Sequence, residues 1–289
     1  MSPLRTPLFI LLTSSALACA SGGTTTTSTP RTARPPASTT ASAPTATASW
    51  SPRFMPGTFQ YEIRTEATIR LDTDTARQER PVEQILLYTV QLAPQGQLLR
   101  ITGVVDSLST QAQQTVPSPD SAAFRNPWQG LVTALGRVSP IQPDTGVCRP
   151  DKQIPLQPIH EILISHPETL TAGGQWKDTT TTLTCRGDVA VSTTSINSYR
   201  IDGPENHRGT PALRVTRSSE VSIRGNGRES GRSVSLAGGG GGTTTIYLDQ
   251  TNGMVINSSG ETRSVITIRT LTGEIPFRQQ VRQEVTRRM

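Results

Sequence analysis

The 289-residue chain has few aromatic residues, few cysteines and almost no lysine. Phe, Trp and Tyr together make up 4% of the residues and hydrophobic residues 33%, so the chain can build only a modest core. Proline and glycine contribute 22 and 24 residues, which predicts many turns. This composition disfavours a helical or α/β body and favours one all-β domain.

Because Lys152 and Lys177 are the two lysines, arginine carries nearly all the positive charge of a protein with net charge +6. A basic protein is often a nucleic-acid binder. Here the arginines are scattered through the expected strands and gather in no single patch, so we expect no nucleic-acid partner. An arginine bias of a GC-rich genome explains the composition, and weak attraction to anionic lipid headgroups stays open.

The sequence also lacks motifs of an enzyme, a metal centre or a cofactor site. His160, His166 and His207 are far from any nucleophile motif and have no chelating spacing, so we interpret them as surface or boundary residues. The glycine run Gly238–Gly242 is not followed by the Lys-Ser/Thr of a phosphate loop and is interpreted as a flexible hairpin tip. We therefore predict no catalytic residues, no metal and no cofactor.

No long apolar run is present near the N-terminus. The stretch from Pro7 to Ala18, preceded by the positive Arg5, is too short to cross a bilayer of roughly 30 Å as a helix. A short apolar stretch after a positive residue is the layout of a signal peptide. We therefore expect export of the chain, with residues 1–18 as the leader.

The segment Ala16-Leu17-Ala18-Cys19 resembles the lipobox of bacterial lipoprotein signal peptides, which ends in a small residue and the Cys that is acylated. Ala16 stands where that family more often has Leu. The resemblance implies cleavage before Cys19, lipidation of its thiol and attachment to a membrane. Because Ala20-Ser21 follows the Cys and no Asp does, it further implies the outer membrane, facing the periplasm or the cell surface. The alternative is an ordinary signal peptide that leaves a free thiol.

Residues 20–52 consist mainly of Ser, Thr, Pro, Ala and Gly. Such a segment buries too little apolar surface to offset the entropy lost on ordering, so residues 19–52 are predicted to form a disordered tether. About thirty residues of this kind reach roughly 30 Å on average. The folded body, residues 53–289, would then stand clear of the membrane.

Within the body, apolar and polar residues alternate as they do in antiparallel strands. The pattern is strongest over Phe59–Arg70, and strands over Leu86–Leu92 and Leu99–Val105 complete a meander. Asp72–Thr75 predicts a turn, and Thr243–Ser259 predicts a hairpin. Further strands are expected at 176–185, 188–195, 196–201, 213–217, 221–224, 234–236, 244–249, 254–257, 265–270 and 277–285. The fold expected is all-β with minor α, a curved antiparallel sheet or half-barrel meander.

One or two short helices are expected to cover this sheet. Pro127–Leu135 has Asn126 as an N-cap, Gly136 as a stop and an apolar stripe at helical spacing. Packing on the sheet is the interpretation of that stripe, and closing an apolar cavity as a lid is its alternative. A second helix is predicted over Pro158–Ser165.

Cys148 and Cys185 are the other two cysteines. In an exported chain, two such thiols predict a disulfide bond, with unpaired thiols or a metal pair as alternatives.

These features together predict a membrane-anchored lipoprotein of the cell envelope with a non-catalytic β-rich binding or structural domain. The meander, the helix and the later hairpins also resemble the LolA/LppX-type lipoprotein-carrier fold, in which helices cover the concave face of a curved sheet. That resemblance implies a carrier of a lipid or another hydrophobic ligand, in a cavity between sheet and helix. A partner protein of the envelope and an uncharacterised enzyme are the remaining alternatives.

Overall fold

The computed structural model describes residues 48–73, 76–112, 127–140, 157–186, 189–229, 231–271 and 273–288. The predicted leader, Cys19, Cys148 and most of the predicted tether lie outside these ranges. The backbone of Cys185 is described but its side chain is not. Lipidation of Cys19 and the disulfide bond between Cys148 and Cys185 therefore stay predictions.

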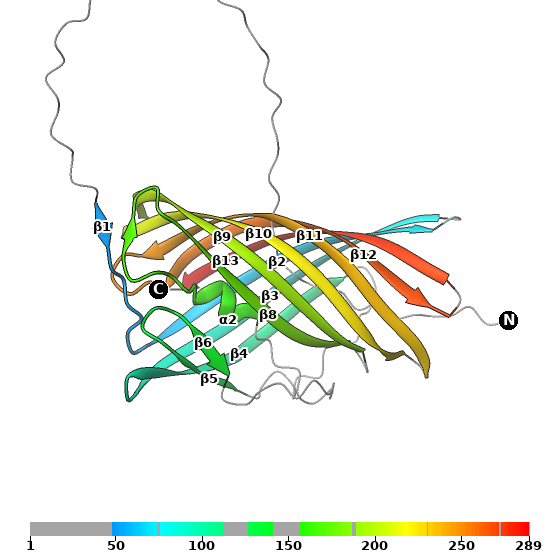
Figure 1. Ribbon diagram of the computed structural model, residues 1–289, viewed down its shortest axis with the longest axis horizontal. Coiled ribbons are helices and arrows are strands. Elements are labelled where there is room, and N and C mark those ends of the chain that lie inside the picture. The colour runs from blue at the N-terminus through cyan, green and yellow to red at the C-terminus, as the bar shows by residue number, and fades with distance from the viewer. Residues whose placement is uncertain are drawn as a thin grey trace, which may run out of the picture.

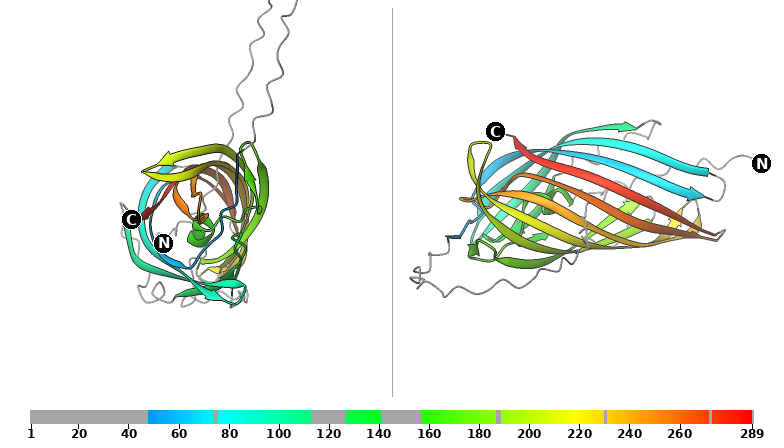
Figure 2. Two further views of the ribbon diagram at one scale, coloured as in Figure 1. Left: turned by 90° about the vertical axis from the view of Figure 1, so that its left-hand side faces the viewer. Right: turned by 90° about the horizontal axis from the view of Figure 1, so that it is seen from above.

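In the described residues, an 11-stranded antiparallel sheet curls around a common interior (Figures 1 and 2). Its order is β6-β5-β4-β3-β2-β13-β12-β11-β10-β9-β8, and β6 and β8 are the two edges, so the sheet stays open. The prediction of an all-β fold with a curved antiparallel sheet is confirmed. The strands are β2 Gly57–Thr73, β3 Ala76–Gln95, β4 Leu98–Ala112, β5 Trp128–Val132, β6 Val138–Pro140, β8 Gln175–Arg186, β9 Val189–His207, β10 Thr210–Glu229, β11 Arg232–Asp249, β12 Val255–Thr270 and β13 Gly273–Arg288.

The last strand of the chain joins two meanders. β13 pairs with β12 on one side and with β2, the first long strand, on the other. Val285 lies opposite Ile63, and Gln283 lies opposite Thr65. The N-terminal meander, β2 to β6, and the C-terminal meander, β8 to β12, thus form one sheet through β13.

The two faces of the sheet differ in chemistry. In β2, Tyr61, Ile63 and Ile69 are buried on the concave face, with Thr65 between them. The alternate positions carry the charged and polar residues of the predicted strand and face outward, partly or fully exposed. Because side chains alternate across a strand, this pattern places an apolar face inside the curve and a charged face outside.

Several strands are longer than predicted, and the glycine run is the clearest correction. Gly238–Gly242 was predicted to be a flexible hairpin tip, but it lies in the middle of β11, paired with β10 and β12. A Cβ on Gly240 would lie 2.1 Å from the carbonyl oxygen of Arg263 in β12. Glycine is therefore required by close approach of the neighbouring strand, the situation expected at a tight bend of a sheet.

The helix predicted over Pro127–Leu135 is wrong. Residues Trp128–Val132 form β5, which pairs with β4 and β6. Trp128, Gly130 and Val132 are buried while Gln129 is exposed, which is an alternation of period two. Positions 128 and 132 share a face in both a helix and a strand, so the apolar pair alone did not distinguish them.

The second predicted helix is confirmed in part, because α2 spans Gln157–Ile162 while Leu163–Ser165 are not helical. α2 lies on the concave side of the sheet, inside the curve of strands seen in the left view of Figure 2. In the described part of the chain, no helix has the length and apolar character needed to cross a membrane.

A short pair of strands stands apart from the main sheet. β1, Ser49–Trp50, pairs with β7, Leu170–Thr171. Nearby in the chain, Phe54 is buried with 4% of its surface exposed. The folded body therefore includes residues 48–52 at the end of the range predicted as tether.

The hairpin predicted over Thr243–Ser259 is confirmed as β11–β12. The Asp249 carboxylate accepts a hydrogen bond from the backbone N–H of Thr251 at 3.0 Å, and the Asp249 N–H donates to the carbonyl of Met254 at 2.9 Å. Gly253 has φ of 69°, which favours glycine. An Asp side chain that accepts a hydrogen bond from the backbone two residues on is common turn chemistry.

Candidate functional site

Polar side chains lie in a row across the middle of the concave face, interrupted at Gly260. Arg217 of β10 lies opposite Thr244 of β11, which lies opposite Gly260 of β12. Gly260 lies opposite Gln283 of β13, which lies opposite Thr65 of β2. Apolar residues occupy the concave face on both sides of this row, in three buried clusters. The row is therefore a polar band within an apolar lining.

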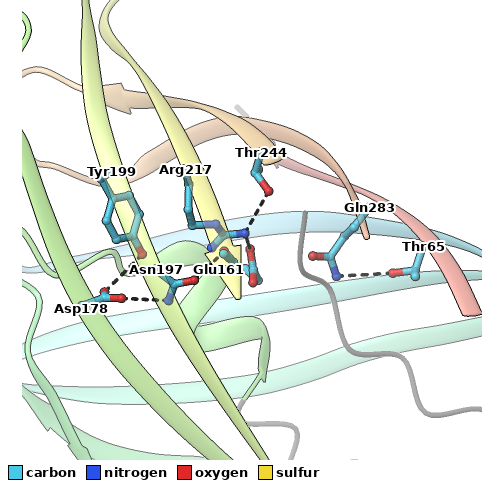
Figure 3. Close-up of polar contacts among 9 residues, drawn as sticks. Thr65, Glu161, Asp178, Asn197, Tyr199, Arg217, Thr244 and Gln283 are labelled. Carbon is cyan, nitrogen blue, oxygen red and sulfur yellow. Dashed lines mark hydrogen bonds and ion pairs between the residues drawn. The ribbon is translucent and has the colours of Figure 1, made fainter. Parts of the chain in front are cut away.

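The centre of this band is a buried ion pair between the sheet and α2. A terminal Nη of Arg217 donates to the Glu161 carboxylate at 2.7 Å and to the Thr244 hydroxyl at 3.2 Å (Figure 3). The side chains of Arg217 and Glu161 are 5% and 10% exposed. Burial lowers the pKa of Arg217, but Glu161 and Tyr199 oppose this and hold the pKa above its ordinary value. Arg217 therefore stays charged in the interior.

A second group of polar side chains lies beside this pair, on β8, β9 and β10. Asp178 accepts hydrogen bonds from Asn197 at 2.8 Å and from Tyr199 at 3.2 Å (Figure 3). Ser219 donates to the other end of the Asn197 amide at 2.6 Å. Burial raises the pKa of Asp178, partly offset by these hydrogen bonds. The group continues the polar band toward the β8 edge.

Not every polar atom of the band is satisfied. The Nε of Arg217, the Thr193 hydroxyl and the Ser264 hydroxyl are buried, and no hydrogen-bond partner is found for them among the described residues. Buried polar groups in native proteins are nearly always hydrogen-bonded. Of these three groups, only the Nε of Arg217 lies in the row itself, since Ser264 pairs with Gly240 and Thr193 with Ile223 farther along their strands. A buried guanidinium N–H without a partner indicates a position that can accept another polar group.

The apolar part of the site is formed by α2 and the sheet beneath it. Ile159 and Ile162 of α2 are completely buried in one cluster with Tyr61 and Tyr88. A Cβ on Gly103 would lie 1.9 Å from the Tyr88 hydroxyl and 3.1 Å from Cδ1 of Ile159, so glycine is required here. Gly103 thus makes room for both side chains. The concave face accepts bulky apolar groups in this region.

The three histidines do not come together. His160 is partly buried on α2, and burial lowers its pKa. His207 is partly exposed and stacks on Tyr247, with ring centroids 3.9 Å apart. His166 was predicted to be a surface or boundary residue, but only 4% of its surface is exposed. That prediction is wrong for His166, because the loop after α2 carries it under Phe54 and the Gly253 turn.

No cluster of three or more potential metal ligands is found within the described ranges. Sequence analysis did not single out Arg217 or Glu161, the residues at the centre of the site. A signal for Arg217 was present, since it occupies the same face as Leu213, Val215 and Val221 in the alternation of β10. An arginine in phase with apolar residues indicates a buried charge. Glu161 carried no comparable signal.

Comparison with protein-family models and with curated proteins gives no match. Among solved structures, Pseudomonas aeruginosa OccK2 (OpdF) is 8% identical, with a TM-score of 0.28 over 80% of this chain and 98% of that chain. Pseudomonas aeruginosa OccK5 (OpdH) is 7% identical, with the same TM-score and the same coverage. A putative outer membrane lipoprotein-sorting protein domain from Vibrio parahaemolyticus is 8% identical, with a TM-score of 0.14 over 79% of this chain and 83% of that chain. At these TM-scores the likenesses support no conclusion about function.

Proposed function

We propose that the chain is a cell-envelope lipoprotein whose body binds a lipid or another hydrophobic ligand, without catalysis, on the concave face beneath α2. The observation that carries the proposal is the chemistry of the two faces. The concave face is apolar on both sides of the polar band, and the convex face is charged. Ligand sites of this kind are concave and mostly apolar, with a few polar groups that fix orientation.

The contacts that hold α2 on the sheet are few, which supports the interpretation of α2 as a removable cover of the concave face. A helix of six residues is too short to be stable alone, so α2 depends on its contacts with the sheet. Those contacts are a few aliphatic side chains and the Arg217–Glu161 pair. A buried ion pair contributes little net stability because both charges lose water. A ligand that matches these contacts would therefore exchange with α2 at modest cost.

Membrane attachment is the second part of the proposal. It rests on the lipobox-like segment that ends at Cys19 and on the Ser/Thr/Pro-rich residues that follow it. An acylated Cys19 would hold the body near a bilayer while the tether let it move, which suits a binder of membrane lipids. Mass spectrometry of the N-terminal peptide from exported protein tests this part. A peptide that begins at an unmodified Cys19 would overturn it.

Lipid extraction tests ligand binding directly. The full chain, purified after export, is extracted with organic solvent, and the extract is compared by mass spectrometry with that of an unrelated protein from the same preparation. The emptied protein is then titrated with a neutral fluorescent probe, N-phenyl-1-naphthylamine. We expect copurified lipid and saturable probe binding. A protein that carries no lipid and binds no probe is a structural or protein-binding module instead.

The double variant E161Q/R217Q provides a matched variant, because it removes the ion pair that attaches α2 to the sheet and leaves no charge buried without a partner. We expect this variant to bind the probe at least as well as the wild type, since α2 covers the face less firmly. Glu205→Ala on the outer end of β9 is the control, because its side chain is exposed. A loss of probe binding in E161Q/R217Q, with unchanged circular dichroism, would contradict the role of α2 as a cover.

A further inference from the structure

α2 presents one carboxylate and two aliphatic side chains to the concave face. Glu161 contacts Arg217 at 2.7 Å, while Ile159 and Ile162 are completely buried among apolar residues of the sheet. This combination of an anionic group and adjoining apolar bulk is the chemistry of an acidic amphiphile. The helix thus shows which kind of molecule the concave face accommodates.

Arg217 contacts one carboxylate oxygen of Glu161, but its guanidinium can bind two oxygens of one anion. Its Nη group already bonds Glu161 and Thr244, but its buried Nε has no partner in the described structure. A guanidinium presents its N–H groups as a fixed fork that matches a carboxylate or phosphate with two parallel hydrogen bonds. A ligand anion free to move could use the unpaired Nε, which Glu161, fixed on α2, leaves without a bond.

A neutral ligand would be disfavoured at this position. If α2 moved away and an uncharged lipid replaced it, Arg217 would remain buried without a counter-charge, which is costly in an apolar interior. Among the described residues, Arg217 is the arginine classed as buried, with 4% of its surface exposed, and Arg287, whose side chain is 13% exposed, has its own counter-charge in Asp249 at 3.1 Å. The charge of Arg217 therefore selects for an anion.

Resting on the proposed function, we propose that the ligand is a single-chain acidic amphiphile whose carboxylate or phosphate replaces Glu161 on Arg217. The acyl chain takes the place of Ile159 and Ile162 against Tyr61 and Tyr88. The hydroxyl of Thr244, which lies opposite Arg217, faces a remaining oxygen of the headgroup. The anion fixes the orientation of the ligand, and the apolar lining holds its chain.

The test compares three ligands that share one chain. Palmitate, hexadecyl phosphate and hexadecanol, each below its aggregation concentration, displace N-phenyl-1-naphthylamine from the delipidated full chain. A charge-assisted hydrogen-bond pair predicts that the two acids bind about tenfold to a hundredfold more tightly than the alcohol. Whichever acid binds more tightly identifies carboxylate or phosphate as the preferred headgroup.

The double variant E161Q/R217Q assigns the preference to Arg217, since it removes both charges and leaves none buried without a partner. We expect it to lose the preference for acids while its affinity for hexadecanol stays within about threefold of the wild type. Arg224→Gln is the control, because Arg224 lies on the same strand but is exposed on the convex face. Circular dichroism verifies the fold of each variant.

The outcomes separate this inference from the proposed function. Equal binding of acids and alcohol by the wild type, or an acid preference that survives in E161Q/R217Q, would overturn the acidic ligand while leaving a hydrophobic ligand in place. Failure of all three ligands and of the probe to bind would overturn the proposed function as well.

Discussion

His166 is a buried histidine whose ring lies 5.8 Å from that of Phe54, between ring centroids. Its Nδ1 lies 2.9 Å from the carbonyl of Pro167, so Nδ1 carries the proton and donates, while Nε2 is buried without a partner in the described structure. Burial lowers the pKa of His166 below its usual value of about 6.5. The folded protein therefore favours the neutral ring.

This shift predicts a pH dependence of stability. The unfolded chain binds a proton at His166 at higher pH than the folded chain does, so stability is complete above about pH 6.5 and falls as the pH decreases. We expect the midpoint of urea unfolding to decrease between pH 7.5 and pH 5. His166→Gln should show a smaller decrease. His160 and His207, whose pKa values are also lowered, account for a decrease that remains in the variant. Identical pH profiles for wild type and His166→Gln would contradict this assignment.

At the scale of elements, the sequence predicted that a helix or strand exists more reliably than it predicted which of the two it is and how long it is. Alternation over Phe59–Arg70 identified β2, because one face of that strand is buried and the other is charged. The same reasoning failed for β5, whose five residues offer too few repeats to separate a period of 2 from a period of 3.6. Gly238–Gly242 was predicted to be a hairpin tip. The contacts that require glycine there are with the backbone of β12, so they leave no signal in the local sequence.

At the scale of elements, a substitution of Gly240 tests how closely β11 and β12 pack. A Cβ at this position would lie 2.1 Å from the Arg263 carbonyl oxygen and 2.7 Å from the Ser264 Cα, so the backbone of β12 must move. Such overpacking typically costs about 1–3 kcal/mol. We expect Gly240→Ala to lower the free energy of unfolding, measured with urea, by that amount. The control is Gly57→Ala, whose added methyl meets only the flexible Phe59 ring, at 3.1 Å. Equal effects of the two substitutions would show that β11 and β12 can separate locally.

At the scale of the molecule, the sequence predicted a curved sheet but gave no strand order. The pairing of β13 with β2 joins residues more than two hundred positions apart, and nothing local in either strand specifies its partner. The candidate site as a whole could likewise not be predicted from the sequence. Arg217 broke the alternation of β10 visibly, but its contact with Glu161 depends on where α2 lies, and that follows from the curvature of the sheet.

Because β13 connects the two meanders, we expect them to unfold together. Trp128 in β5 and Trp176 in β8 lie near opposite edges of the sheet, so single-tryptophan proteins that retain one or the other report on each meander. Their fluorescence midpoints in urea should coincide, as a single cooperative transition requires. Val281 of β13 is 1% exposed, whereas its neighbour Gln280 faces outward.

Val281→Asp should therefore lower and separate the two midpoints, since a buried unpaired carboxylate weakens the strand that both meanders share. Gln280→Asp, on the convex face of the same strand, should leave the midpoints coincident. Separate midpoints in the absence of any change in β13 would show that the two meanders are independent folding units, and β13 would then be only a point of contact between them.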